Sequence, residues 1–237
     1  MGSSLQTSNV IAICGLKCSG KDSAAKMLYY LLNTPKCFHS YKWFKFFKGK
    51  PFKKDWLLTA FAKPLKQTLS VILNKPLEWF EDRDNKENCY VNLSSLKIYK
   101  KDTLSQEIML SENKFLKIIK SEETIPAEYL ISIRQLMQYY GTNVIRKFLG
   151  DKTWINATLN TNGENKIIVS DLRFRVEYEE IKNKKGTTIY IKRDSAVPGN
   201  HSSEREVIDL YNENKLDYVI ENNGTLEDLF NNIKKLL

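Results

Sequence analysis

Histidines, paired cysteines and long apolar runs are scarce in this sequence, and each scarcity excludes a class of protein. His39 and His201 are the only histidines, and none of the four cysteines has the CxxC spacing of a zinc site. We therefore expect neither a structural zinc site nor a disulfide framework, and we expect reduced thiols. No apolar run approaches the roughly 20 residues that a membrane-spanning helix needs, so no membrane partner is expected.

Sorting signals are also missing from the start of the sequence. Residues 1–6 lack the basic and apolar segments of a secretory signal peptide. Gln6 stands where a myristoylation signal has serine or threonine. We therefore expect an intracellular, cytoplasmic protein.

Positive charge, by contrast, is abundant: the formal net charge is +9. Such a charge favours anionic partners, which include nucleotides, nucleic acids and acidic metabolites. Aromatic residues and lysines are interleaved in the stretch 41–52, a mixture found in grooves that bind single-stranded nucleic acid. The other interpretation is an irregular insertion whose rings pack on the core while its lysines stay in water. We favour this second interpretation and do not expect a nucleic-acid partner.

The stretch 15–23, with the sequence GLKCSGKDS, organises the chain. An apolar run precedes it and a helical pattern follows it, and a strand, a glycine turn and a helix together form a phosphate cradle. Gly15 and Gly20 allow backbone conformations and close approaches that a Cβ would obstruct. The N–H groups of the loop and of the helix start then point at an anion, and Lys21 adds a positive charge for the β- and γ-phosphates.

The loop departs from the usual pattern at the position after the lysine. A serine or threonine normally stands there and binds magnesium, but this chain has Asp22, followed by Ser23. We expect Mg²⁺ to be held by Asp22, directly or through water, or by Ser23. A chance glycine loop is the competing interpretation, and the flanking strand and helix disfavour it.

Short apolar runs alternate with helical patterns through most of the chain. This alternation predicts an α/β protein with a central, mostly parallel sheet, formed as one domain over residues 1–237. Ligands in such sheets bind at the carboxyl ends of the strands, so the loop at Gly15, Lys63 and the stretch 171–173 should converge.

The predicted strands cover residues 9–14, 57–62, 166–171, 187–191 and 217–220. The predicted helices cover residues 24–32, 65–73, 76–88 (helix or turn), 128–149 with a break at Gly141 and Thr142, 151–160 (helix or loop), 174–183 and a last helix capped by Thr225. A turn is expected at 162–163, and insertions at roughly 36–56 and 93–124, the second as one or two surface helices.

Further polar residues lie where a ligand could be held. Asp171 follows an apolar run, where an acid either holds the magnesium of a triphosphate or caps a turn. Arg173 and Arg175 suit a phosphate, or they pair with the acids at 177–180.

A helical stretch and a histidine–serine stretch complete the candidates. Arg134, Gln138 and Thr142 lie about one helical turn apart, so they share a face that either grips a ligand or is an exposed polar stripe. The stretch 201–204 lacks the glycine-flanked turn of a catalytic serine, so a hydrolase is not expected.

Taken together, these segments resemble the deoxynucleoside monophosphate kinases of large bacteriophages and large DNA viruses. The similar blocks occur in the family's order and span most of the chain. They are residues 17–23, 61–66, 134–142 with 154–157, 170–174 with Glu177, 201–204 and 222–226. The departures are Cys18, where the family often has arginine, and the two insertions.

The resemblance implies a three-layer P-loop kinase fold. It also implies that the γ-phosphoryl group of ATP is transferred to a deoxynucleoside monophosphate, with ATP and Mg²⁺ as cofactors. For a viral chain, the compartment would be the host cytoplasm. It also implies residue roles. ATP would be bound by Gly15, Lys17, Ser19, Gly20, Lys21, Asp22 and Ser23, with Asn223 and Gly224 near the adenine. The acceptor would be surrounded by Lys17, Arg83, Arg134, Gly141, Thr142, Trp154, Asp171, Arg173 and Glu177. Catalysis would rest on Lys21, Arg134, Asp171 and Arg173, and the metal on Asp22, Ser23 and Asp171.

Two other functions remain open at this point. A phosphomevalonate-type kinase has a similar loop, but it needs no aromatic side chain for a base, so Trp154 favours the nucleotide kinase. A nucleic-acid-binding protein that uses ATP as a switch would explain the stretch 41–52. The sequence leaves open the accepted bases, the sugar preference and whether the protein forms a homodimer.

Overall fold

The computed structural model describes residues 5, 8–121, 123–161, 165–197 and 202–237, with the backbone alone for residues 161 and 202–204. The chain divides into two compact units. The first, which we call the parallel-sheet unit, comprises Met1–Phe61 and Ile155–Leu237, and the second, the antiparallel-sheet unit, comprises Ala62–Trp154. The turn expected at 162–163 and the placement of His201 lie outside the described residues.

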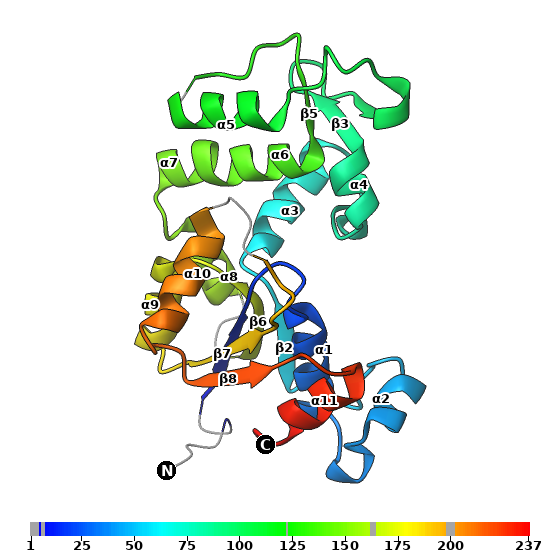
Figure 1. Cartoon of the computed structure of the whole chain (residues 1–237), viewed down its shortest axis with the longest axis vertical. Coiled ribbons are helices and arrows are strands. Elements are labelled where there is room, and N and C mark those ends of the chain that lie inside the picture. Colours follow the sequence, from blue (N-terminus) through cyan, green and yellow to red (C-terminus); the bar gives the residue numbers. More distant parts are fainter. Residues whose placement is uncertain (1–4, 6–7, 122, 162–164, 198–201) are drawn as a thin grey trace. The chain divides into compact units, whose positions relative to one another are not determined.

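The parallel-sheet unit contains five strands in the order β2-β6-β1-β7-β8, and each neighbouring pair is parallel (Figure 1). The strands are β1 (Val10–Cys14), β2 (Trp56–Thr59), β6 (Lys166–Leu172), β7 (Thr187–Lys192) and β8 (Tyr218–Glu221). Each apolar run that predicted a strand of this sheet forms one, with small differences at the ends. The parallel sheet confirms the predicted α/β class.

Helices cover both faces of this sheet because alternate residues of β1 point to opposite sides. Ile11 and Ile13 belong to a buried cluster that contains side chains of α1 and α11. Val10, Ala12 and Cys14 belong to a second cluster with side chains of α8, α9 and α10. The three layers are helices, sheet and helices, as predicted (Figure 1). The helices are α1 (Lys21–Leu32), η2 (Lys36–Phe38), α2 (Tyr41–Phe46), α8 (Thr153–Thr161), α9 (Arg175–Asn183), α10 (Ser202–Asn212) and α11 (Leu226–Lys234).

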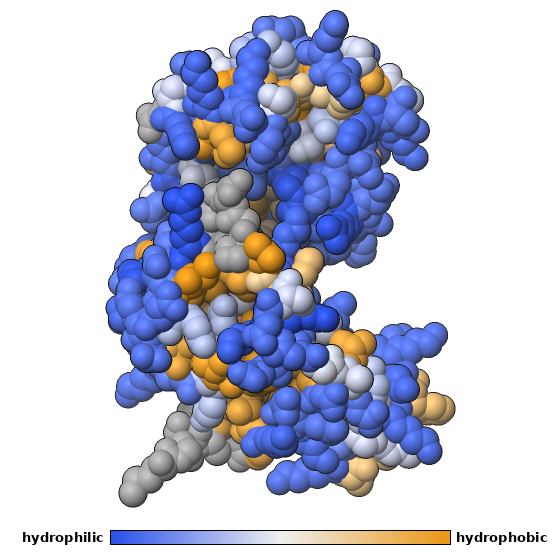
Figure 2. All heavy atoms as spheres, viewed as in Figure 1, coloured by the Kyte–Doolittle hydropathy of each residue, from blue (hydrophilic) through white to orange (hydrophobic). Residues whose placement is uncertain are grey.

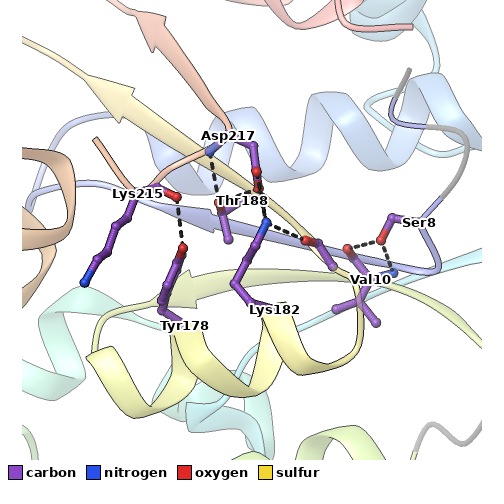
Figure 3. Close-up of polar contacts among 8 residues, drawn as sticks. Ser8, Val10, Tyr178, Lys182, Thr188, Lys215 and Asp217 are labelled. Carbon is purple, nitrogen blue, oxygen red and sulfur yellow. Dashed lines mark hydrogen bonds and ion pairs between the residues drawn. The ribbon is translucent and has the colours of Figure 1, made fainter. Parts of the chain in front are cut away.

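A polar cluster joins α9 to the two last strands (Figure 3). The ammonium group of Lys182 donates to both carboxylate oxygens of Asp217, at 2.9 and 3.0 Å. The backbone N–H and the hydroxyl of Thr188 donate to the same carboxylate, at 2.8 and 2.7 Å. Asp217 lies directly before β8 and Thr188 lies in β7, so one carboxylate ties a helix to the edge of the sheet.

The antiparallel-sheet unit contains a three-stranded sheet in the order β4-β3-β5. Its core includes Leu69, Phe80, Val91, Phe115 and Ile131, all of them less than 2% exposed. The strands are β3 (Cys89–Asn92), β4 (Ile98–Lys100) and β5 (Leu130–Ser132). The helices are α3 (Ala62–Ile72), η3 (Leu77–Phe80), α4 (Arg83–Asn88), η4 (Lys101–Thr103), α5 (Glu112–Ser121), α6 (Ile133–Gln138), the π-helix η5 (Tyr139–Arg146) and α7 (Lys147–Leu149).

The prediction of helices throughout residues 93–124 was wrong in its first part. Ile98–Lys100 is a strand that pairs with β3, and only Glu112–Ser121 forms an α-helix. The carboxamide oxygen of Asn92 accepts hydrogen bonds from the N–H groups of Ser94 and Ser95, which stabilises the turn of the hairpin. Strands of three and four residues are too short for their period to stand out in a charged sequence.

The predicted helix 128–149 was wrong at its start, where Leu130–Ser132 forms β5, and in its break at Gly141 and Thr142. Both residues lie inside the π-helix, which follows α6 without interruption. A wider helical turn accommodates the extra residue, so the chain stays helical where the glycine suggested an end. Among the described residues, no helix is long and apolar enough to cross a membrane.

Candidate active site

The loop from Gly15 to Gly20 joins β1 to α1 with backbone angles that favour glycine. Gly15 has φ of 152°, and a Cβ there would lie 2.5 Å from the Ser19 hydroxyl and 2.7 Å from the Ile191 carbonyl oxygen. Gly20 has φ of 92°, and its Cβ would lie 2.3 Å from the carboxamide nitrogen of Asn222. Both glycines are therefore required by close contacts, as the motif predicted.

Lys21 begins α1 and is only 8% exposed. Its ammonium group donates to the carbonyl oxygen of Leu16 at 3.5 Å, so the side chain folds back over the loop. Burial raises the pKa of the Cys14 thiol to about 12, and the nearby charge of Lys21 acts in the opposite direction. The lysine therefore places a positive charge at the carboxyl end of β1, where a phosphate would approach.

Ser19 supplies the most direct test of whether the loop fits a phosphate. Its side chain is 1% exposed, and its hydroxyl has no hydrogen-bond partner within the described part of the chain. Most buried hydroxyls in proteins are bonded, so an exception needs an explanation. A phosphate bound in this type of loop would supply an oxygen that accepts from the Ser19 hydroxyl. The residues present therefore fit a bound triphosphate.

The residues expected to hold magnesium lie at the start of the same helix. Asp22 is exposed and Ser23 is half-buried in the first turn of α1. A carboxylate and a hydroxyl are oxygen ligands of the kind that Mg²⁺ prefers. The donor chemistry therefore fits the metal of a nucleoside triphosphate.

Asn222, which follows β8, holds the loop from a distant part of the sequence. Its carboxamide donates to the carbonyl oxygen of Ser19 at 2.8 Å, and the residue is 4% exposed. Its backbone N–H donates to the carbonyl oxygen of Lys192, at the end of β7. We did not single out Asn222 from the sequence; its place in the family-like block 222–226 was the available signal.

Asn223 and Gly224, expected near the adenine, follow directly. The carboxamide of Asn223 accepts from the N–H of Asp194 at 2.9 Å and donates to its carboxylate at 2.7 Å. A Cβ on Gly224 would lie 2.6 Å from a carboxylate oxygen of Asp228, which bonds Thr225 at the start of α11. The predicted cap at Thr225 is confirmed.

Asp171 is the second-to-last residue of β6, which continues to Leu172, so it lies inside the strand rather than beyond it. One of its carboxylate oxygens accepts from the N–H of Phe61 at 2.6 Å, which ties the end of β6 to the segment after β2. Leu172 pairs with Cys14, so Asp171 and the loop at Gly15 lie at the same edge of the sheet. This part of the expected convergence is confirmed.

Arg173 and Arg175 have different environments. The Arg173 side chain is exposed and makes no ion pair with any described residue. Arg175 instead forms a two-pronged ion pair with Glu213, at 2.9 and 2.6 Å. Salt bridging therefore explains Arg175, with a partner other than the acids at 177–180.

Glu177, expected beside the acceptor, is 2% exposed in α9. Its carboxylate accepts from the backbone N–H groups of Arg173 and Phe174, at 2.8 and 3.1 Å. It thus fixes the backbone that carries the Arg173 side chain. Lys17, another expected contact, is exposed in the loop.

The remaining candidates belong to the antiparallel-sheet unit. Arg134, at the start of α6, donates to one carboxylate oxygen of Glu87 through Nε at 3.1 Å and Nη2 at 2.7 Å. Both side chains are more than a third exposed. Because Gln138 and Thr142 are separated by the start of the π-helix, the three residues no longer follow regular α-helical spacing. Arg83 and Lys63 are exposed at the starts of α4 and α3.

Trp154 is 7% exposed and belongs to the core of this unit. Its indole N–H donates to the carbonyl oxygen of Gly141 at 3.0 Å. Gly141 is buried, and a Cβ there would lie 3.2 Å from the side chain of Leu65. Trp154 and Gly141 are thus brought together, through packing and one hydrogen bond.

A parallel sheet covered by helices on both faces, with a glycine loop between β1 and α1 and a buried lysine at the start of α1, has the fold of P-loop kinases. A family model described as deoxynucleotide monophosphate kinase matches residues 9–233. The chain belongs to the deoxynucleotide monophosphate kinase family.

A curated relative supports this assignment. A putative deoxynucleotide monophosphate kinase of Acanthamoeba polyphaga mimivirus is 28% identical over 115 residues. The match covers 42% of this chain and 58% of the viral protein, so the chain spans little more than half the length of that relative.

Proposed function

We propose that this protein transfers the γ-phosphoryl group of ATP to the 5′-phosphate of a deoxynucleoside monophosphate. The bond between the γ-phosphorus and the β–γ bridging oxygen breaks, a bond to an acceptor phosphate oxygen forms, and ADP and a deoxynucleoside diphosphate leave. The product would serve DNA precursor synthesis. The observation that carries the proposal is the loop of residues 15–20 in a chain of this family, with a buried Ser19 hydroxyl that has no hydrogen-bond partner among the described residues.

The loop and α1 would bind the donor nucleotide. Ser19 and the loop N–H groups donate to phosphate oxygens, and Lys21 neutralises charge on the β- and γ-phosphates. Mg²⁺, when bound, would neutralise further phosphate charge. The residues that would hold it are Asp22, Ser23 and, directly or through water, Asp171. The proposed ATP-binding residues are Gly15, Lys17, Ser19, Gly20, Lys21, Asp22 and Ser23, with Asn223 and Gly224 near the adenine.

For the acceptor, candidate residues are proposed in the parallel-sheet unit and, separately, in the antiparallel-sheet unit. In the parallel-sheet unit, Arg173 would bind the monophosphate, with Lys17 and Asp171 nearby. Glu177 would act through the backbone of Arg173, because its carboxylate bonds the N–H of that residue. In the antiparallel-sheet unit, the proposed residues are Arg83, Arg134, Gly141, Thr142 and Trp154. Lys21, Arg134, Asp171 and Arg173 are the proposed catalytic residues.

A coupled ADP-release assay tests the proposal across acceptors. Protein, ATP and Mg²⁺ would be mixed with each common deoxynucleoside monophosphate, each ribonucleoside monophosphate and phosphomevalonate. We expect at least one deoxynucleoside monophosphate to stimulate ADP release. Stimulation by phosphomevalonate alone, or by none of the acceptors, would reject the proposal.

A further inference from the structure

The segment between α1 and β2 carries a large share of the protein's positive charge. Residues 34–54 contain seven lysines and no aspartate or glutamate, in a chain whose net charge is +9. All seven lysine side chains are exposed, and within the described part of the chain none pairs with a carboxylate. They are Lys36, Lys42, Lys45, Lys48, Lys50, Lys53 and Lys54.

The inner side of this segment is fixed to the parallel-sheet unit. The rings of Tyr41 and Phe44 pack on Phe230 of α11, with centroids 5.9 and 5.6 Å away. The ammonium group of Lys234 donates to the carbonyl oxygen of His39 at 2.8 Å. Figure 1 shows α2 beside α11. The prediction that the aromatic rings pack on the core is therefore confirmed for this inner side.

The outer side of the segment has a different aromatic arrangement. Phe52 stacks on Phe38 at a centroid distance of 4.8 Å and remains 50% exposed. Phe46 meets Trp43 and Phe47 edge-on, at 5.6 and 5.1 Å, and remains 70% exposed. Two phenylalanine rings are thus held in place by neighbouring rings and still face solvent. For these two residues, packing on the core does not account for the aromatic side chain.

We propose that this lysine–phenylalanine surface, formed by the seven lysines with Phe46 and Phe52, binds single-stranded nucleic acid. Lysine ammonium groups attract the phosphates, and exposed rings stack on unpaired bases. The supporting rings fix the orientation of Phe46 and Phe52, which reduces the conformational entropy lost on binding. Stacking and phosphate attraction discriminate little between bases, so the binding should tolerate changes of sequence.

An anionic membrane would satisfy the charges but not the arrangement of the rings. A helix that lies on a membrane needs a continuous apolar face. In α2 the side chains of Tyr41 and Phe44 face the core, while Phe46 shares the exposed side with Lys42 and Lys45. Figure 2 shows the region over α2 and α11 as mainly hydrophilic, with a few apolar side chains at its edge. Isolated rings among cations suit bases and phosphates better than lipid chains.

Fluorescence anisotropy with a labelled oligothymidine tests the proposal on the full chain. We expect binding that weakens steeply with salt and persists with saturating ATP and Mg²⁺ and in Lys21→Ala, because the phosphate loop is a separate site. The double variant K42E/K45E should bind at least about tenfold more weakly. Phe46→Ala and Phe52→Ala should each weaken binding about tenfold, as expected for a lost stacking partner. Nucleotide turnover by K42E/K45E, Phe46→Ala and Phe52→Ala should stay unchanged.

The matched control is K117E/K120E, which makes the same charge change on exposed lysines of α5. Its affinity should fall much less than that of K42E/K45E. Equal losses in the two double variants would show a diffuse charge effect and overturn the proposal. No binding by the wild type would also overturn it, as would binding to phosphatidylserine vesicles or polyglutamate but not to the oligonucleotide.

Discussion

Ser19 and Thr188 are both buried hydroxyl residues in the parallel-sheet unit, yet within the described part of the chain only the Thr188 hydroxyl has a hydrogen-bond partner. A buried hydroxyl without a partner contributes nothing to the folded state in the absence of ligand, and its removal can even be stabilising. The pair therefore separates a ligand-binding role from a structural one.

For Ser19→Ala we predict an unchanged or slightly higher Tm and an ATP Kd that rises about three- to tenfold, as for one lost hydrogen bond. Thr188→Val should lower Tm and leave the ATP Kd unchanged. Thermal melts and titration with a non-hydrolysable ATP analogue measure both quantities. A lower Tm with an unchanged Kd for Ser19→Ala would contradict a phosphate contact.

Arg173 and Arg175 form a second informative pair, because only Arg175 has an ion-pair partner among the described residues. We predict that Arg173→Ala lowers kcat/KM for the acceptor by about tenfold to a hundredfold, the value of a lost charge-assisted contact. The KM for ATP should change little. Arg175→Ala, the control, should leave both constants near the wild-type values. Steady-state kinetics would contradict the assignment if the two variants behaved alike.

Local motifs could be predicted from the sequence because they are defined by residues that are close to one another along the chain. Gly15, Gly20 and Lys21 follow from the loop pattern and its flanking elements. The bond from Asn222 to Ser19 could not be predicted, because it joins residues 203 positions apart. The partner of Arg175 was missed for the same reason, since Glu213 lies beyond the acids considered. The hydrogen bond from the Arg173 N–H to the Glu177 carboxylate was also not predicted, because it depends on where α9 begins.

At the scale of secondary-structure elements, Asn222 connects the turn between β8 and α11 to the phosphate loop. We predict that Asn222→Ala raises the KM for ATP about tenfold while the acceptor KM changes little, because the Ser19 carbonyl loses its donor. Asn222→Asp should be worse, since a carboxylate repels that carbonyl. Asn232→Ala is the control, because Asn232 makes a longer bond, 3.4 Å, to the Glu221 carbonyl. A fall in Tm with an unchanged ATP KM would reduce Asn222 to a structural residue.

The polar cluster between α9, β7 and β8 predicts a pH effect on stability. Burial of Asp217 acts to raise its pKa, but hydrogen bonds from Lys182 and Thr188 outweigh it, so the pKa is lowered from 3.8. A lowered pKa means that the folded state binds this proton less readily than the unfolded state does. The stabilisation is therefore complete above pH 3.8 and is lost as the pH falls through the folded-state pKa.

Asp217→Asn should lower the free energy of unfolding near neutral pH by about 1–2 kcal/mol, because its charge-assisted bonds are partly exposed. The loss of stability on acidification should also become smaller. Urea unfolding over a pH series measures both, with Glu179→Gln as an exposed control. An acid response equal to that of the wild type would show that Asp217 does not contribute.

Strand prediction succeeded in the parallel sheet and failed in the small antiparallel sheet. Each of the five parallel strands contains an apolar run that the sequence shows clearly, even in β2 and β8, which have four residues each. The small antiparallel sheet has strands of three or four residues within a charged part of the sequence. The π-helix was not predicted because it contains a glycine, which usually indicates the end of a helix. Helix α10 had no prediction, because its buried residues Val207 and Leu210 are too few to mark a period.

At the scale of the whole molecule, we propose that the parallel sheet and the exposed lysines bind two different anionic ligands. The parallel sheet presents the phosphate loop at the carboxyl end of β1, and we propose that a nucleotide binds there. The exposed lysines of residues 34–54 are proposed to serve a nucleic acid instead. The net charge of +9 indicated anionic partners, but it could not show whether the protein binds one anionic ligand or two.

Product analysis tests the central claim most directly. ATP, Mg²⁺ and the best deoxynucleoside monophosphate would be incubated with the protein, and all nucleotides would be quantified by chromatography. We predict equal amounts of ADP and deoxynucleoside diphosphate, with formation reduced by at least about a hundredfold in Lys21→Ala. ADP and inorganic phosphate without the diphosphate would instead show an ATPase and contradict the proposed transfer.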